Sequence, residues 1–193
     1  MLLTNFKTEY KTMTIKVLEL VEGCMPQIID KGDWIDLVTK EDVTLRCPQA
    51  CKLHRRKGKN QQVENEERTR DVVFNYTLIG LGICVEVPKG YESIVVPRSS
   101  TFKKYGLLQT NSIGVIDQSY CGEEDEWKMP VVATRQVTIP KGTRVAQLKV
   151  QLSQMATPWQ KIKWLFSHKP KFKKVESLNN KTRGGFGSTD KNN

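Results

Sequence analysis

The stretch NSIGVIDQSYCGE, at residues 111–123, places a carboxylate at the end of an apolar strand. Asp117 directly follows the apolar run GVI, and Tyr120 comes three residues later. A carboxylate that emerges at a strand end beside a turn suits a general base that activates water. The alternative is an aspartate that caps a turn, which is a common role after a strand. For Tyr120 the alternatives are lining the same pocket and packing in the core.

A second polar group stands at the motif PRSS, after the strand-like segment YESIVVP. Here Arg98 offers a charged fork, and Ser99 and Ser100 offer two short hydroxyl donors. Groups of these types can hold phosphate oxygens. A structural ion pair is the alternative role for Arg98.

The segment RGGFGSTD, at residues 183–190, contains three glycines and one aromatic residue, and it cannot bury a core. One interpretation is a frayed tail. The other is a lid that closes over a phosphate group, because glycines let a backbone hinge and approach a ligand closely.

Short strands must position these groups. The segment TIKVLEL alternates apolar and polar residues, and the strands that follow are rich in β-branched and aromatic residues. Turn signals such as Pro88-Lys89-Gly90 and Pro140-Lys141-Gly142 separate them. This pattern predicts an all-β sandwich, barrel or jelly roll. The predicted strands lie within residues 14–20, 71–88, 91–97, 111–117, 129–140 and 143–152.

Two segments depart from the strand pattern. Residues 47–70 are polar and charged, and they are expected to form a partly mobile loop insertion. Residues 157–168 predict a helix with Thr157 as its N-cap and Trp159, Ile162 and Phe166 on one face. The expected organisation is an N-terminal extension (1–12), a β-barrel (13–156), a basic helical insertion (157–175) and a flexible arm (176–193).

The formal net charge of +10 and the pI of about 9.4 indicate an anionic partner, such as a nucleotide, a nucleic acid or a membrane surface. No signal peptide or membrane span is apparent, which suggests a cytoplasmic protein. Five cysteines, an odd number, argue against a disulfide framework. Cys47, Cys51 and His54 have a spacing that allows three zinc ligands, and incidental thiols in a loop are the alternative.

Five segments in order resemble the motifs of the trimeric, all-β deoxyuridine triphosphate nucleotidohydrolase (dUTPase) family: DWIDLVT around Asp36, PRSST, NSIGVIDQSYCGE, KGTRVAQL and RGGFGSTD. The resemblance implies a distorted jelly-roll β-barrel and a homotrimer with active sites at subunit interfaces. It also implies hydrolysis of dUTP to dUMP and pyrophosphate, which limits uracil in DNA and supplies dUMP for dTMP synthesis.

The resemblance assigns each motif residue a role. Asp117 would deprotonate the water that attacks the α-phosphorus, Tyr120 would pack under the deoxyribose, and Asn111 would lie at the hairpin whose backbone pairs with uracil. The phosphate contacts would come from Arg98, Ser99, Ser100 and Gln147, with Asp36 and Arg144 as a supporting pair. In the arm, Arg183, Ser188 and Thr189 would grip the γ-phosphate, Phe186 would stack over uracil, and Gly184, Gly185 and Gly187 would let the backbone approach the ligand.

Mg²⁺ is the expected cofactor. The sequence offers no all-protein metal cage, and Mg²⁺ commonly binds through substrate phosphates and retained waters.

Two alternatives remain at this point. A dCTP deaminase of the same fold needs a glutamate in the strand after the third motif, and residues 128–137 contain no acid. A non-enzymatic module would bind nucleic acid or protein through basic residues such as those at 159–174. The favoured interpretation of that stretch is a helix docked on the barrel by its aromatic residues, with its lysines in solvent.

Overall fold

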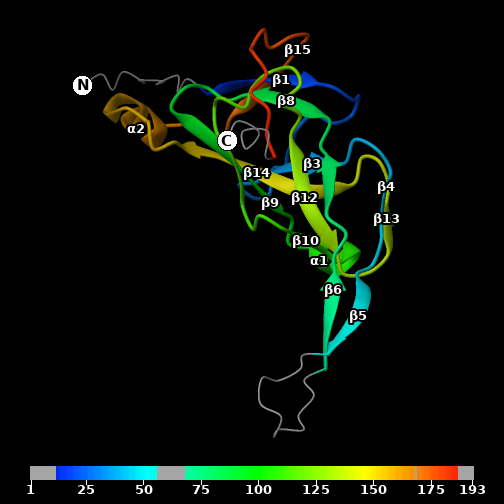
Figure 1. The fold of residues 1–193 in the computed structure, drawn as a ribbon. Coiled ribbons are helices and arrows are strands. Elements are labelled where there is room, and N and C mark those ends of the chain that lie inside the picture. The colour runs from blue at the N-terminus through cyan, green and yellow to red at the C-terminus, as the bar shows by residue number, and fades with distance from the viewer. Residues whose placement is uncertain (1–11, 56–67, 168, 187–193) are drawn as a thin grey trace, which may run out of the picture.

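The computed structural model describes residues 12–55, 68–167 and 169–186, and short strands dominate it (Figure 1). The prediction of an all-β fold is confirmed. A five-stranded sheet has the order β11 (Gly114–Ile116), β9 (Tyr91–Pro97), β14 (Arg144–Leu152), β3 (Ile35–Val38) and β2 (Gln27–Ile28). Two three-stranded sheets have the orders β15 (Lys171–Val175), β1 (Thr14–Glu19), β8 (Ile83–Glu86), and β10 (Leu107–Gln109), β12 (Lys128–Ala133), β7 (Thr77–Gly80). The remaining pairs are β13 (Val137–Ile139) with β4 (Val43–Leu45), and β5 (Gln49–Arg55) with β6 (Arg68–Val73).

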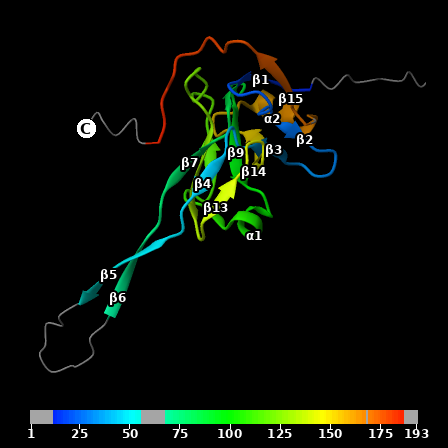
Figure 2. The same cartoon turned by 90° about the vertical axis from the view of Figure 1, so that its right-hand side faces the viewer.

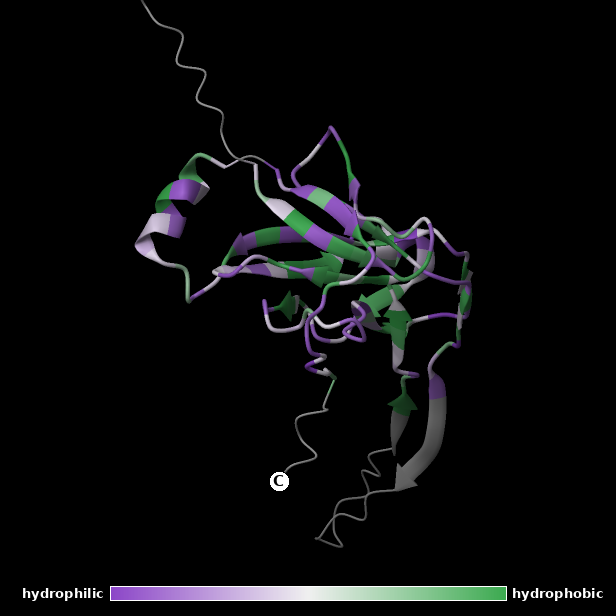
Figure 3. Ribbon diagram, turned by 90° about the horizontal axis from the view of Figure 1, so that it is seen from above, coloured by the Kyte–Doolittle hydropathy of each residue, from purple (hydrophilic) through white to green (hydrophobic). Residues whose placement is uncertain are grey.

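Alternation along the strands separates a buried face from an exposed one. In β1, Ile15 and Val17 are fully buried, whereas Thr14 and Lys16 are exposed. This is the two-residue period expected of a strand with one face on the core. Figure 3 shows it as alternating green and purple bands along the strands.

The central strand β14 brings three motif segments side by side. It pairs antiparallel with β9 on one edge and with β3 on the other, so that Gln147 lies opposite both Val96 and Asp36. The end of β9, which leads into PRSS, therefore lies beside the start of β14 and the middle of β3.

The segment predicted as a loop insertion contains an antiparallel hairpin. Strands β5 and β6 pair from Gln49 opposite Val73 to Arg55 opposite Arg68, and the hairpin projects away from the body (Figure 2). Composition pointed to a loop because the segment is polar. Backbone hydrogen bonds across an antiparallel pair depend little on residue type, so polar residues form strands there.

A short helix that the sequence did not predict, α1 (Thr101–Tyr105), follows directly after PRSS. It is too short to show a helical period in the sequence. It ends at Gly106, which adopts the left-handed conformation (φ 68°) and donates its N–H to the carbonyl of Phe102 at 2.7 Å.

The second helix, α2 (Pro158–Leu165), begins as predicted at Thr157. Its N-terminus is a capping box: the Thr157 hydroxyl accepts from the Gln160 N–H at 3.3 Å, and the Gln160 side chain accepts from the Thr157 N–H at 2.8 Å.

The predicted docking face of α2 is wrong. Trp159 and Ile162 are 63% and 47% exposed, and it is Trp164 that packs against the body, with its ring 5.7 Å from that of Tyr91. A two-turn helix contacts its neighbours through only a few side chains on one face, and in α2 Trp164 makes the contact with the core. Figure 3 shows α2 standing at the edge of the molecule.

Residues 171–175 were grouped with the helical insertion but form β15, which runs parallel to β1 with Phe172 opposite Ile15. The alternation in KFKKV places Phe172 against the core, which suits a strand and not a helix. This strand directs the following chain back across the body toward the third motif.

Over the described ranges, no helix is long and apolar enough to cross a membrane.

The cysteines that the structure describes, Cys24, Cys47, Cys84 and Cys121, are free thiols. Burial raises the pKa of Cys84 to about 12, so that this thiol stays protonated and unreactive at neutral pH.

Gly82 is expected to tolerate no side chain. Its φ of +67° lies in the left-handed region, and a Cβ there would lie 2.7 Å from Cys24 Sγ and 3.0 Å from Lys40 Cβ. Gly82→Ala should therefore lower the free energy of unfolding by about 2–4 kcal/mol, measured by denaturant titration. Gly23→Ala is the matched control, because Gly23 has a φ of +89° but nothing within 4 Å of its Cβ position. Equal losses in the two variants would show that the contact at Gly82 is not tight.

Candidate active site

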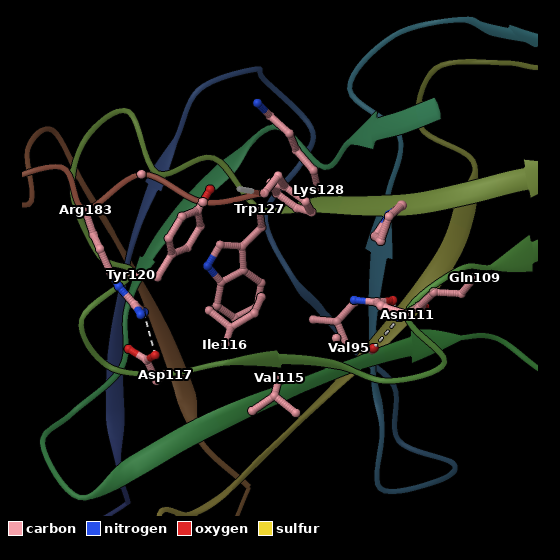
Figure 4. Close-up of a pocket in the computed structure, with 15 residues that line it drawn as sticks. Val95, Gln109, Asn111, Val115, Ile116, Asp117, Tyr120, Trp127, Lys128 and Arg183 are labelled. Carbon is pink, nitrogen blue, oxygen red and sulfur yellow. Dashed lines mark hydrogen bonds and ion pairs between the residues drawn. The ribbon is translucent and has the colours of Figure 1, made fainter. Parts of the chain in front are cut away.

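A cavity of about 270 Å³ lies between the hairpin of β10 and β11, the start of β12 and the C-terminal arm (Figure 4). It gathers residues from the third and fifth motifs, which are more than 60 positions apart in the chain, as the Arg183–Asp117 pair illustrates. Its lining consists of Val95, Gln109, Asn111, Gly114, Val115, Ile116, Asp117, Tyr120, Trp127, Lys128, Pro130, Arg183, Gly184, Gly185 and Phe186.

Asp117 stands at the end of β11, as predicted, and its carboxylate faces the cavity mouth. One oxygen, Oδ1, accepts hydrogen bonds from the backbone N–H of Ser119 at 2.8 Å and from the Ser119 hydroxyl. The other oxygen, Oδ2, lies 2.5 Å from the Arg183 guanidinium. Asp117 therefore caps the turn and also lines the cavity, so its turn-capping role does not exclude the predicted role as a base.

Partial burial raises the pKa of Asp117, but the Ser119 hydrogen bonds and the Arg183 ion pair outweigh it. The net result is a pKa below the usual aspartate value. Asp117 is therefore ionised at neutral pH.

Tyr120 lines the cavity with its ring while its hydroxyl donates to the backbone carbonyl of Glu126 at 3.0 Å. Burial, followed by the nearby Asp125 carboxylate, raises its pKa to about 12, so the phenol stays neutral. A Cβ on Gly185 would lie 2.9 Å from the Tyr120 ring. Only glycine allows the arm to approach the ring this closely.

The hairpin residue Asn111 also lines the cavity, beside Gln109 at the end of β10. Leu107 is buried and Ile116 is partly buried, whereas Ile113 is 52% exposed. Ile113 sits at the hairpin tip, where no second layer covers it.

Asp125 fixes the arm to the third motif, a role that the sequence did not indicate. Its side chain is fully buried, and it accepts backbone N–H groups from Gly122 at 2.8 Å, Arg183 at 2.9 Å and Gly184 at 2.9 Å. The acidic run at residues 123–126 reads as a solvated loop in the sequence. Nothing in the run EEDE distinguishes Asp125 from its exposed neighbour Glu124.

The arm passes over the cavity of its own chain. Gly122 admits it closely, since a Cβ there would lie 2.4 Å from Thr182 Cα. Phe186 lines the cavity and is half-exposed. The predicted contacts of Gly187, Ser188 and Thr189 lie outside the described residues.

A second polar cluster forms where β3, β9 and β14 meet. The buried Asp36 carboxylate lies 2.8 Å from Arg98 Nε and 3.3 Å from Arg144. The structure thus brings Asp36 and Arg144 together as the resemblance implied, and it adds Arg98 as a structural ion-pair partner. Gln147 is held beside them, its amide donating to the Pro97 carbonyl at 3.4 Å.

Ser99 and Ser100 lie just before α1, next to this second cluster. Neither serine lines the cavity, and neither do Arg98 and Gln147. A single chain therefore presents the predicted site as two separate parts, one around Asp117 and one around Asp36.

In the part of the chain that the structure describes, no three His, Cys, Asp or Glu residues are placed to hold a metal ion. Cys47 is exposed. The side chains of Cys51 and His54, the other two candidate zinc ligands, lie outside the described residues.

Comparison with known proteins identifies relatives over most of the chain. A family model described as dUTPase matches residues 65–189. The SPbeta prophage-derived deoxyuridine 5'-triphosphate nucleotidohydrolase YosS of Bacillus subtilis is 35% identical over 161 residues, which cover 83% of this chain and 86% of that protein. The deoxyuridine 5'-triphosphate nucleotidohydrolase of Thermobifida fusca is 33% identical over 171 residues, which cover 86% of this chain and 72% of that protein.

Solved structures share the fold. The dUTPase from Streptococcus mutans has a TM-score of 0.55 at 18% identity, covering 75% of this chain and 98% of that one. A Staphylococcus bacteriophage 80alpha dUTPase mutant, solved with dUpNHpp, has a TM-score of 0.53 at 17% identity, covering 88% and 100%. At these identities the likeness concerns the fold alone, and it agrees with the predicted dUTPase-like barrel.

The low pKa of Asp117 should depend on Ser119. Ser119→Ala removes the hydroxyl donor and leaves the backbone N–H, so the pKa of Asp117 should rise. The measurement is an NMR titration of the Asp117 carboxyl carbon. Thr138→Ala, which removes an exposed hydroxyl on β13, is the control and should leave that titration unchanged. A lower pKa in Ser119→Ala would contradict the proposed cause.

Asp125→Asn should release the arm. An asparagine keeps one acceptor oxygen but turns an amide N–H₂ toward backbone N–H donors, at a cost of about 1–3 kcal/mol. Hydrogen exchange of the Arg183 and Gly184 amides should become faster, because both donate to the Asp125 carboxylate. Glu124→Gln, at the exposed neighbouring position, is the control. Unchanged protection in Asp125→Asn would show that other contacts hold the arm.

Proposed function

The chain belongs to the dUTPase family, and we infer that it is a dUTP diphosphatase that hydrolyses dUTP to dUMP and pyrophosphate. The observation that carries this inference is the cavity, where an ionised Asp117, the Tyr120 ring and the C-terminal arm meet. The cavity offers a base, a flat apolar surface and a cation within one space, which are the groups that hydrolysis of a nucleoside triphosphate requires.

Asp117 serves as the general base. Its carboxylate accepts a proton from water as the water oxygen attacks the α-phosphorus. The bond from that phosphorus to the oxygen bridging to the β-phosphorus breaks, and pyrophosphate leaves. A positioned base of this kind contributes about 10²–10⁴-fold to the rate.

The nucleoside binds against Tyr120 and the β10–β11 hairpin. Because the Tyr120 hydroxyl is tethered to the Glu126 carbonyl, the ring presents a fixed face to the deoxyribose. A fixed ring leaves no room for a 2′-hydroxyl, which separates dUTP from UTP by shape. Phe186 covers the base from the arm.

The triphosphate needs groups that the cavity of one chain does not supply. Ser99, Ser100 and Gln147 are the phosphate contacts, and they stand in the second cluster, away from Asp117. A homotrimer in which a neighbouring chain brings its second cluster to this cavity completes the site. Arg98 contributes by holding Asp36, and Arg144 supports the same carboxylate.

Mg²⁺ is the proposed cofactor. A solved dUTPase from phage phi11 of S. aureus, whose TM-score is 0.52, is described with a structural Mg(II) ion. The donor set of this chain fits an ion bound through substrate phosphates and waters, so the residues that hold the triphosphate would hold the metal indirectly. When bound, it would neutralise phosphate charge and set the shape of the triphosphate for in-line attack.

The alternatives have less support. Strand β12 carries no acidic residue where a dCTP deaminase requires one, and the relatives are named nucleotidohydrolases. Nucleic-acid binding through residues 159–174 was the alternative not favoured by the sequence, and it stays untested. A free nucleotide as substrate points to the cytoplasm as the compartment.

The first experiment measures pyrophosphate release from dUTP, dCTP, dTTP and UTP with Mg²⁺, for the wild type and Asp117→Asn. We expect fast release from dUTP alone and a loss of about 10²–10⁴-fold in the variant, because asparagine cannot accept the proton. Absence of release from any nucleotide by the wild type would overturn the proposed function.

The composite site has its own test, which uses two inactive variants. Co-expression of Asp117→Asn with Ser99→Ala should restore part of the activity, because some sites would then combine an intact Asp117 with an intact Ser99 from another chain. Each variant expressed alone is the control. If one chain supplied both residues, the mixture would stay inactive.

A further inference from the structure

Two side-chain amides lie side by side at the hairpin end of the cavity, Gln109 at the end of β10 and Asn111 in the turn that follows (Figure 4). The Gln109 amide nitrogen donates one hydrogen bond to the Val95 carbonyl at 3.2 Å and another to Asn111 Oδ1 at 2.8 Å. Both of its N–H groups are therefore used, and both acceptors are oxygens.

This arrangement fixes the orientation of Gln109. The Val95 carbonyl belongs to β9, which pairs with β11 and β14, so it cannot turn away. If the Gln109 amide flipped, its own oxygen would face two other oxygens, the Val95 carbonyl and Asn111 Oδ1. The amide nitrogen must therefore point at both acceptors.

The orientation of Asn111 follows from that of Gln109. Because Oδ1 of Asn111 is held by Gln109, its Nδ2 turns to the opposite side, and Figure 4 shows this nitrogen toward the middle of the cavity. The hairpin is packed closely here, since a Cβ on Gly114 would lie 3.2 Å from the Val95 carbonyl oxygen. The cavity thus receives a donor from Asn111 and no acceptor.

Gln109 also carries a cost that an apolar residue would avoid. Its Oε1 is buried and has no hydrogen-bond partner among the described residues. A buried acceptor without a partner is unfavourable, and methionine or leucine would fill the same space without it. The two hydrogen bonds donated by the Gln109 nitrogen must therefore compensate for the unfavourable burial of Oε1.

We propose that Gln109 is a specificity-determining positioning residue, which holds Asn111 so that its amide N–H₂ faces the pyrimidine C4 substituent. This inference rests on the proposed function. An N–H₂ donor pairs with the 4-oxo group of uracil and meets another donor in the 4-amino group of cytosine. Gln109 itself acts through Asn111 and needs no contact with the nucleotide.

The main test removes the Gln109 donors. In Gln109→Met the Asn111 amide is free to turn its oxygen toward the base, so cytosine is no longer rejected. The dUTP over dCTP ratio of kcat/KM should fall at least about tenfold, and the dUMP over dCMP ratio of binding constants, measured by calorimetry, should fall with it. Gln151→Met is the matched control. Gln151 lies on β14, its amide nitrogen donates to the Glu92 carboxylate at 2.6 Å, and it does not line the cavity.

A second variant tests the same idea without touching Gln109. In Asn111→Asp, one carboxylate oxygen still accepts from Gln109, and the other faces the base as an acceptor. Binding of dCMP should then strengthen relative to dUMP by about tenfold or more.

Two results would overturn the proposal. The first is an unchanged nucleotide ratio in a Gln109→Met protein that melts like the wild type. The second is a parallel loss of dUMP and dCMP binding with a lowered melting temperature, which would make Gln109 a brace of the hairpin only. A wild type that binds dUMP but releases no pyrophosphate from dUTP would instead reject the proposed function, and the two binding ratios would still decide the role of Gln109.

Discussion

The buried carboxylate of Asp125 is the group on which the arrangement of the cavity depends. It collects backbone N–H groups from Gly122 in the third motif and from Arg183 and Gly184 in the arm. A buried charge is tolerated only when hydrogen bonds replace its lost hydration, and here the loop and the arm supply those hydrogen bonds jointly. The position of Arg183 over Asp117, and of Gly185 against Tyr120, follows from this one attachment.

The central sheet imposes the other constraint, because it places the two halves of the predicted site on different parts of one chain. Strands β9, β14 and β3 bring Arg98, Gln147 and Asp36 together, while the hairpin after β10 carries Asp117 to the cavity. The Asp36 carboxylate lies between Arg98 and Arg144 and neutralises their charge. Without it, the two guanidinium groups would repel each other. The two ion pairs hold Arg98 and Arg144 in place without a ligand, which would lower the entropy cost of binding the phosphate proposed to lie there.

Short-range patterns in the sequence predicted the parts of this structure that depend on them. Period-two alternation located β1, the strand-like composition of YESIVVP located β9, and the N-cap residue Thr157 located the start of α2, because each is decided within a few residues. Contacts between segments that are distant in the chain could not be predicted from these short-range patterns. Asp125 resembles its exposed neighbours until the arm folds onto it, and Gln109 resembles an ordinary strand residue until Val95 and Asn111 are placed around it. The outward face of α2 was missed for the same reason, since only the position of Tyr91 decides which aromatic residue docks.

The pairing of Arg183 with Asp117 connects the arm to the chemistry. In the structure, this pairing occupies one oxygen of the base and helps to hold its pKa low, which makes the carboxylate a weaker proton acceptor. A triphosphate carries more negative charge than one carboxylate, so in the proposed mechanism it draws the guanidinium away. The freed Asp117 oxygen can then bind water, and the pKa of the Asp117 carboxyl group rises toward the ordinary aspartate value. Substrate binding would thereby strengthen the base, which would reach its working strength only when a triphosphate is present.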